Sequence, residues 1–115
     1  MTDFCIQIHP DRNRDLDFDR VRKVCEGLAA DKALIKWFAF SDRPADGRER
    51  RHINLLFDTD RPADLWRALL VKLYQCETVG RPLQMSSMAM CEGDGGWSDY
   101  LLLHHYDPRE RLHRL

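Results

Sequence analysis

The chain has 115 residues, of which 43% are hydrophobic and 32% are charged, and its formal net charge at pH 7 is -1. This length and composition predict a single folded, soluble domain. The near-neutral charge gives no overall field that attracts nucleic acid, and the apolar runs are too short to span a membrane. Because the N-terminus also lacks a signal peptide pattern, we expect a cytoplasmic protein that binds neither nucleic acid nor membranes.

The first part of the chain predicts a strand, a helix and a second strand. Hydrophobic side chains alternate over residues 4–9, which is typical of a strand with one buried face. Residues 18–28 repeat hydrophobic side chains at helical spacing, and either Asp15 or Asp17 can cap the start of this helix. The aromatic-rich residues 34–40 predict the second strand.

The middle of the chain predicts a hairpin followed by a second helix. Residues 41–51 form a polar loop with a turn at Asp46 and Gly47, and a third strand covers 52–58. A helix opens near Pro62 and is expected to end at Gly80 in a left-handed cap, with Pro82 blocking its continuation.

The last third predicts two further strands, over 84–92 and 97–106, joined by a glycine-rich turn at 93–96. The order βαββαβ plus a C-terminal hairpin strand resembles the ferredoxin-like split βαβ arrangement. We therefore expect an α+β two-layer sandwich, with two helices on one face of an antiparallel sheet. The expected strand order is 4-1-3-2, with the fifth strand beside the fourth.

Side-chain alternation predicts which residues occupy the sheet face without helices. If Lys36 points away from the helices, Phe38 and Phe40 lie beside it, and Trp37 and Ala39 enter the core. The predicted interface on this face consists of Phe38, Phe40, Leu56, Met88 and Met90. A register shift at a bulge is the alternative, and it would turn Phe38 and Phe40 inward and Trp37 outward.

Five large apolar side chains on one face form a patch that monomeric proteins rarely leave exposed to water. Fully burying a side chain of this size contributes about 1.5–3 kcal/mol. A second subunit, a ligand, a partner protein or the C-terminal tail can each supply the cover. We therefore expect a homo-oligomer or a protein partner.

Histidine and tyrosine side chains are the candidates for chemistry. His9, His52 and His104, together with Tyr106, are suited to acid–base catalysis, although the sequence does not order them into a site. No His or Cys spacing matches a metal-binding motif, so we expect no metal and no cofactor. The four cysteines are expected to be free thiols in a reducing compartment.

The leading hypothesis is a small interaction module that self-associates or binds a protein through its uncovered sheet face. The alternative is a cofactor-independent enzyme of the dimeric α+β barrel type that uses His, Tyr and Asp as acid–base groups. A third hypothesis is an inhibitor or immunity-type partner of another protein. An RNA-recognition domain is disfavoured, because the strand at 52–58 has neither the glycine nor the stacking aromatic residues of that class.

Overall fold

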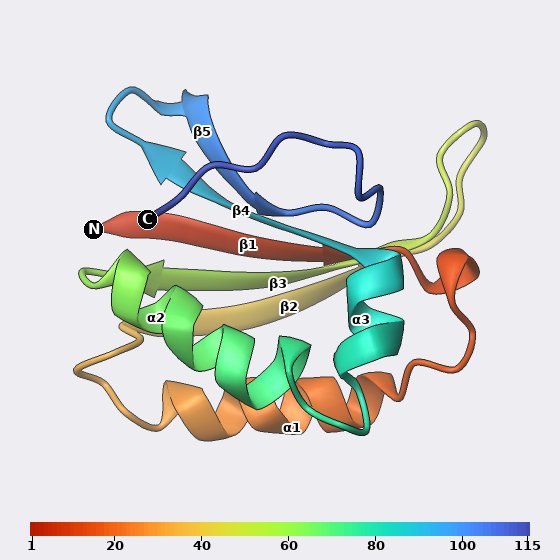
Figure 1. The fold of residues 1–115 in the computed structure, drawn as a ribbon, viewed down its shortest axis with the longest axis horizontal. Helices are drawn as coiled ribbons and strands as arrows, with labels where there is room; N and C mark the ends of the chain where they lie inside the picture. Colours follow the sequence, from red (N-terminus) through yellow and green to blue (C-terminus); the bar gives the residue numbers. More distant parts are fainter.

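Five antiparallel strands form one sheet, and the helices lie on one of its faces in the computed structural model, which describes residues 1–115 (Figure 1). The strands are β1 (Thr2–Ile8), β2 (Trp37–Arg43), β3 (His52–Thr59), β4 (Ser87–Gly93) and β5 (Gly96–His104). The helices are α1 (Phe18–Ala29), α2 (Pro62–Leu69) and α3 (Gly80–Ser86), with a 3-10 turn η1 (Pro10–Arg12) and a π-helical turn η2 (Leu70–Tyr74). The strand order is β2-β3-β1-β4-β5, so each strand has the neighbours that the sequence predicts.

The hydrophobic core lies between the sheet and the helices. Alternate residues of β1 and β3 are buried, as their hydrophobic pattern predicts. These residues are Phe4, Ile6 and Ile8 in β1, and Ile53, Leu55 and Phe57 in β3. The helices contribute Val21, Cys25, Leu65, Leu69 and Leu73. Of the two predicted capping residues Asp17 caps α1, because its carboxylate accepts a hydrogen bond from the Arg20 N–H at 3.1 Å.

Phe38 and Phe40 lie on the helix side of the sheet, so their predicted position on the uncovered face is wrong. Directly paired residues of antiparallel strands share a face, and Phe38 pairs with Phe57 while Phe40 pairs with Leu55. Both partners belong to the core. The Phe38 ring centroid lies 5.1 Å from that of Phe57, and the Phe40 ring centroid lies 6.1 Å from that of Phe18 in α1.

The physical reason is a break in the alternation before β2 begins. Ile35 is fully buried and Phe38 also faces the core, so strict alternation does not run through these residues. The backbone bends at Lys36, and the strand begins only at Trp37, whose side chain is 51% exposed. Ala39 follows Trp37 to the uncovered face, which is the predicted alternative register.

The second helix and the fourth strand also differ from their predicted limits. Gly80 starts α3 instead of capping α2, and Pro82 lies in the first turn of α3, where its missing N–H is not needed. Gly80 does not have a positive φ. Glycine is needed here because the backbone of Tyr74 approaches closely: a Cβ at this position would lie 2.5 Å from the Tyr74 carbonyl oxygen. Since α3 continues to Ser86, β4 begins three residues later than predicted.

The C-terminal residues after β5 are not helical, and they run back beside the strand (Figure 1). The His113 N–H donates to the Leu102 carbonyl oxygen at 2.7 Å, and the His113 Nδ1 accepts from the Leu102 N–H at 3.0 Å. These bonds satisfy backbone groups of β5, which is an edge strand. None of the helices has the length and apolar character needed to cross a lipid bilayer.

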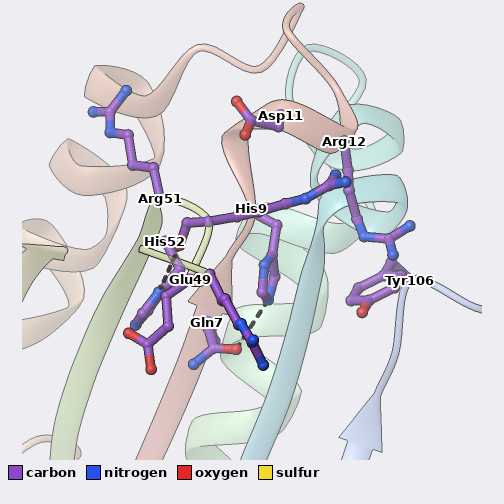
Figure 2. A pocket seen from close by; sticks show the side chains of 10 residues that line it. Gln7, His9, Asp11, Arg12, Glu49, Arg51, His52 and Tyr106 are labelled. Atoms are coloured by element: carbon purple, nitrogen blue, oxygen red, sulfur yellow. Dashed lines mark hydrogen bonds between the residues drawn. The ribbon is translucent and has the colours of Figure 1, made fainter. Parts of the chain in front are cut away.

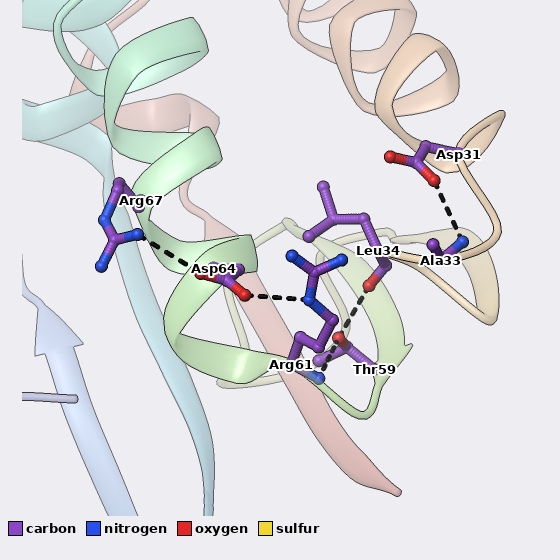
Figure 3. Close-up of polar contacts among 7 residues, drawn as sticks. All are labelled: Asp31, Ala33, Leu34, Thr59, Arg61, Asp64 and Arg67. Atoms are coloured by element: carbon purple, nitrogen blue, oxygen red, sulfur yellow. Dashed lines mark hydrogen bonds and ion pairs between the residues drawn. The ribbon is translucent and has the colours of Figure 1, made fainter.

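Thr59 ties the end of β3 to the loop between α1 and β2 (Figure 3). Its side chain is fully buried, and its hydroxyl donates to the Leu34 carbonyl oxygen at 2.7 Å. The same hydroxyl oxygen accepts a hydrogen bond from the Arg61 N–H at 2.9 Å. One side chain therefore satisfies backbone groups in two loops that are far apart in sequence.

We expect Thr59→Val to lower the free energy of unfolding by about 1–3 kcal/mol, because it leaves these backbone groups without their partner. Urea denaturation measures the change. Thr59→Ser keeps the hydroxyl and removes only a methyl group, so its loss should be near 1 kcal/mol or less. Equal losses in the two variants would contradict this role of the hydroxyl.

Candidate functional site

The sheet face opposite the helices carries four rows of side chains that run across the strands, as strand register and alternation define them. The acidic row contains Trp37, Asp58, Asp3 and Glu92. The apolar row contains Ala39, Leu56, Cys5, Met90 and Leu102. The polar row contains Ser41, Asn54 and Gln7 and ends in the apolar Met88. The basic row contains Arg43, His52 and His9. Leu56, Met88 and Met90 of the predicted interface therefore share this face, whereas Phe38 and Phe40 do not.

The acidic row concentrates negative charge at one end of the face. Asp3 is paired directly with Asp58, and its N–H donates to Glu92 Oε1 at 2.7 Å. None of these three carboxylates forms an ion pair with a basic side chain. The hydrogen bond with Asp58, partial burial and the Asp58 charge raise the pKa of Asp3. Like charges directly opposite each other are destabilising. A positively charged group placed against this end of the face would therefore relieve the repulsion.

The apolar row lies beside the acidic row and is flanked by two tryptophans. Leu56 and Met90 are half-buried at its centre. Trp37 and Trp97 are 51% and 43% exposed, and they line one hollow of about 140 Å³ together with Leu56. Large aromatic side chains around a small apolar hollow are typical of protein interfaces.

The polar row connects this apolar surface to the basic end through hydrogen bonds. The Gln7 amide nitrogen donates to Asn54 Oδ1 at 3.3 Å, and the Gln7 Oε1 lies 2.9 Å from the His9 Nε2. The Cys5 thiol donates weakly to the same Asn54 oxygen at 3.9 Å. These contacts fix the side-chain orientations along the middle of the face, and they hold the His9 ring in place.

The basic end of the face opens into a cavity of about 520 Å³ beneath the β2–β3 hairpin (Figure 2). His9 follows β1 and His52 begins β3, and because these strands are antiparallel neighbours the two rings lie 6.2 Å apart. The Tyr106 ring, which follows β5, packs edge-on against His9 at 5.5 Å. The Arg12 guanidinium of η1 stacks 3.6 Å above the centre of the Tyr106 ring.

The structure therefore brings together three of the four side chains that the sequence selects for chemistry, namely His9, His52 and Tyr106. His104 is not part of this group. It pairs with the core residue Ala89 on the helix side, where its ring lies 4.7 Å from that of Tyr74. His104 is separated from the other three because an irregularity in the β4–β5 pairing changes which β5 residues face the helices.

The electrostatics of the cavity favour a neutral His9. Burial lowers the pKa of His9, and the positive charges of His52, Arg12 and His105 lower it further. The one hydrogen bond that the His9 side chain makes is to the Gln7 amide, so no carboxylate orients the ring as in a catalytic relay. The Cys5 thiol bonds to Asn54, and burial raises its pKa to about 11. These contacts are typical of a binding site. They lack the hydrogen-bonded acid–base pair of a catalytic site.

The alternation predicted from the sequence places Asp58 and Glu92 on the uncovered face, but the predicted elements do not indicate Asp3, Trp97 or Arg12, and an exposed Trp37 follows only in the alternative register. Asp3 directly precedes the core residue Phe4, and Asp58 directly follows the core residue Phe57. Strand alternation is therefore sufficient to place both carboxylates on the uncovered face, once the first strand is extended to include Asp3. The exposure of Trp37 depends on which residues of β2 face the helices, and the bend at Lys36 changes this alternation. Arg12 reaches Tyr106 from a loop, and no sequence period describes that contact.

No group of three or more His, Cys, Asp or Glu side chains is arranged to hold a metal ion. Comparison of the chain with models of protein families, with curated proteins and with solved structures finds no significant match.

Proposed function

We propose that the protein is an interaction module that self-associates through the sheet face opposite the helices. The single observation that supports this proposal is the order of the rows: acidic, apolar, polar and basic along one face. A surface of this kind is complementary to a second copy of itself in the reversed direction.

Charge selects between the two ways of stacking such faces with aligned strands. If the strands of the two copies ran in the same direction, Asp3 and Asp58 would oppose the same carboxylates of the other copy. If the second copy is reversed, the acidic row lies over His52 and Arg43 of the partner, and each end receives the opposite charge. The two apolar rows then lie side by side near the centre, each over the polar row of the other copy, and the exposed Trp37, which pairs with Asp58, is covered at the acidic end. Removal of these side chains from water supplies the hydrophobic part of the association.

Sedimentation equilibrium over a range of protein concentrations tests the proposal. We expect a dimer for the unchanged chain and a monomer for Leu56→Lys, which places a charge at the centre of the apolar row. Val71→Lys is the matched control, because Val71 is 57% exposed on η2, away from this face, and its variant should remain dimeric. A strictly monomeric protein at all concentrations, or equal behaviour of both variants, would refute the proposal.

A charge exchange tests the reversed orientation separately. One variant carries Asp3→Lys and Asp58→Lys, and the other carries Arg43→Glu and His52→Glu. Each variant alone should dissociate, because like charges then meet at both ends. An equimolar mixture should form heterodimers, since opposite charges again meet at both ends. If both variants remain dimeric alone, self-association stands and the reversed orientation is wrong.

Acid–base chemistry on a small molecule, without a cofactor, is the second candidate function. The observation in its favour is that His9, His52 and Tyr106 line one cavity. It ranks below self-association, because no carboxylate or hydroxyl lies within hydrogen-bonding distance of either His9 ring nitrogen.

We also infer that β1–α1–β2–β3–α2–β4 is a ferredoxin-like unit to which β5 adds an edge strand. The position of β1 between β3 and β4, with β2 at the opposite edge from β5, supports this assignment. The short helix α3 between α2 and β4 is an addition to that plan. The four free thiols support a reducing compartment such as the cytoplasm.

A further inference from the structure

We propose that the cavity at the basic end is a binding site for a small phosphorylated molecule rich in hydroxyl groups, of the sugar phosphate class. This inference goes beyond self-association and does not depend on it. In the reversed dimer the partner's acidic row would cover His52 of this cavity, so ligand binding and dimer formation would compete. The cavity, of about 520 Å³, is of the size that holds small organic ligands.

The arginines of the cavity carry the inference. Four arginines and two acidic residues line it, a net charge of +2, or +1 when the Arg51–Asp42 ion pair is left out, in a chain whose total charge is -1. Arg51 is neutralised by a bidentate ion pair with Asp42, at 3.0 and 2.7 Å, and its side chain extends away from His9 and Tyr106 (Figure 2). Arg12, Arg48 and Arg50 form no ion pair with a carboxylate.

Arg12 is positioned in advance for an anion. Its guanidinium lies flat above the Tyr106 ring, so stacking restricts its rotation while its edge N–H groups remain free to donate. Two parallel N–H groups of a guanidinium match two oxygens of a phosphate, and such bidentate bonds are among the strongest polar contacts in proteins. His9 lies beside the Tyr106 ring and His52 lies beside His9 in the same cavity.

The remaining lining excludes an apolar ligand. Tyr106 is the one hydrophobic residue of the cavity wall, and the Arg12 guanidinium already covers one face of its ring. The other groups are hydrogen-bonding side chains, among them Gln7, Asp11 and Glu49. Carboxylates beside an anion site are suited to accept hydrogen bonds from the hydroxyl groups of the same ligand, which is why we assign a hydroxyl-rich phosphate ester and not a lipid or an aromatic acid.

Isothermal titration with glucose 6-phosphate, inorganic phosphate and glucose at constant ionic strength tests the site. The titrations use the Leu56→Lys variant as well as the unchanged chain, so that binding is measured whether or not the protein dimerises. We expect glucose 6-phosphate to bind most tightly, inorganic phosphate to bind more weakly, and glucose not to bind. Chemical-shift changes of the His9 and His52 imidazole protons locate the ligand.

Arg12→Ala and Arg50→Ala should each weaken glucose 6-phosphate binding by about tenfold or more, which corresponds to the loss of one charge-assisted contact. Arg111→Ala is the matched control, because Arg111 is an exposed arginine of the tail that forms no ion pair, and its affinity should not change. Absence of binding at millimolar concentration, or equal affinity in all three variants, would overturn the proposal. Loss of binding with an intact dimer would leave the proposed self-association untouched, and the reverse also holds.

Discussion

Raising the pH from 7 to 10 should lower the free energy of unfolding by about 3–4 kcal/mol, because three thiols are buried in the folded protein. Burial raises the pKa of Cys5 and Cys91 to about 11, and burial together with the Glu26 charge raises that of Cys25 to about 12. The ordinary thiol pKa in the unfolded chain is 9.0. Between these values the unfolded state releases protons that the folded state keeps.

The sign of the effect follows from this proton count. Because the unfolded state binds fewer protons above pH 9, stability falls as the pH rises, at about 1.4 kcal/mol per pH unit for each thiol. Burial also raises the pKa of Tyr74, so the decline should continue beyond pH 10. Cys76 is half-buried, and its hydrogen bond with Thr78 lowers its pKa, so it opposes the decline.

Urea denaturation at pH 7 and at pH 10, followed by far-UV circular dichroism under reducing conditions, measures this change. The double variant Cys5→Ala, Cys91→Ala should lose about two thirds of the pH dependence, whatever its stability at pH 7. Cys76→Ala is the control that should not reduce the decline. Stability that is independent of pH between 7 and 10 would show that the thiols are not buried as described.

The parts of the fold that the sequence predicts are those where a strict period runs without interruption. β3 alternates through its whole length, and β1 alternates except at Cys5, which is buried although it faces away from the helices. The buried residues Phe4, Ile6, Ile8, Ile53, Leu55 and Phe57 agree with the prediction. This alternation also fixed the correct face for Leu56, Met88 and Met90. The meeting of His9 and His52 follows from the same register, because the end of one strand lies beside the start of its antiparallel neighbour.

The parts that the sequence does not predict depend on contacts between segments far apart in the chain. A charged residue usually marks the solvent side of a strand, but Lys36 precedes β2 and says nothing about its phase. Gly80 is required because the Tyr74 carbonyl oxygen approaches it closely. In the sequence, a glycine at this position after a helical pattern is typical of a helix C-cap, so the contact could not be predicted. His104 follows an irregularity in β5 that its own neighbours do not signal.

Phe57→Ala should lower the free energy of unfolding by about 3–5 kcal/mol, because it removes a ring that is 1% exposed from the centre of the core. The ring contacts Phe4 edge-on at 6.1 Å and Phe38 at 5.1 Å. Leu56→Ala is the matched control in the same strand. Its side chain points to the opposite face and is half-buried, so we expect a loss of no more than about 1 kcal/mol when stability is measured at a concentration below that of self-association.

A double-mutant cycle between Phe38 and Phe57 extends this prediction to the corrected register of β2. Each single alanine variant removes the contact between the two rings, and aromatic pairs at this distance contribute about 0.5–1.5 kcal/mol beyond their burial. The double variant should therefore be more stable by that amount than the sum of the single losses implies. Trp37 and Phe57 point to opposite faces, and their cycle should show no coupling. Coupling of Phe57 to Trp37 instead of Phe38 would show that Phe38 and Phe40 face away from the helices. The β2 residues of the four rows would then be assigned to the wrong face, and the row order that supports self-association would no longer include β2.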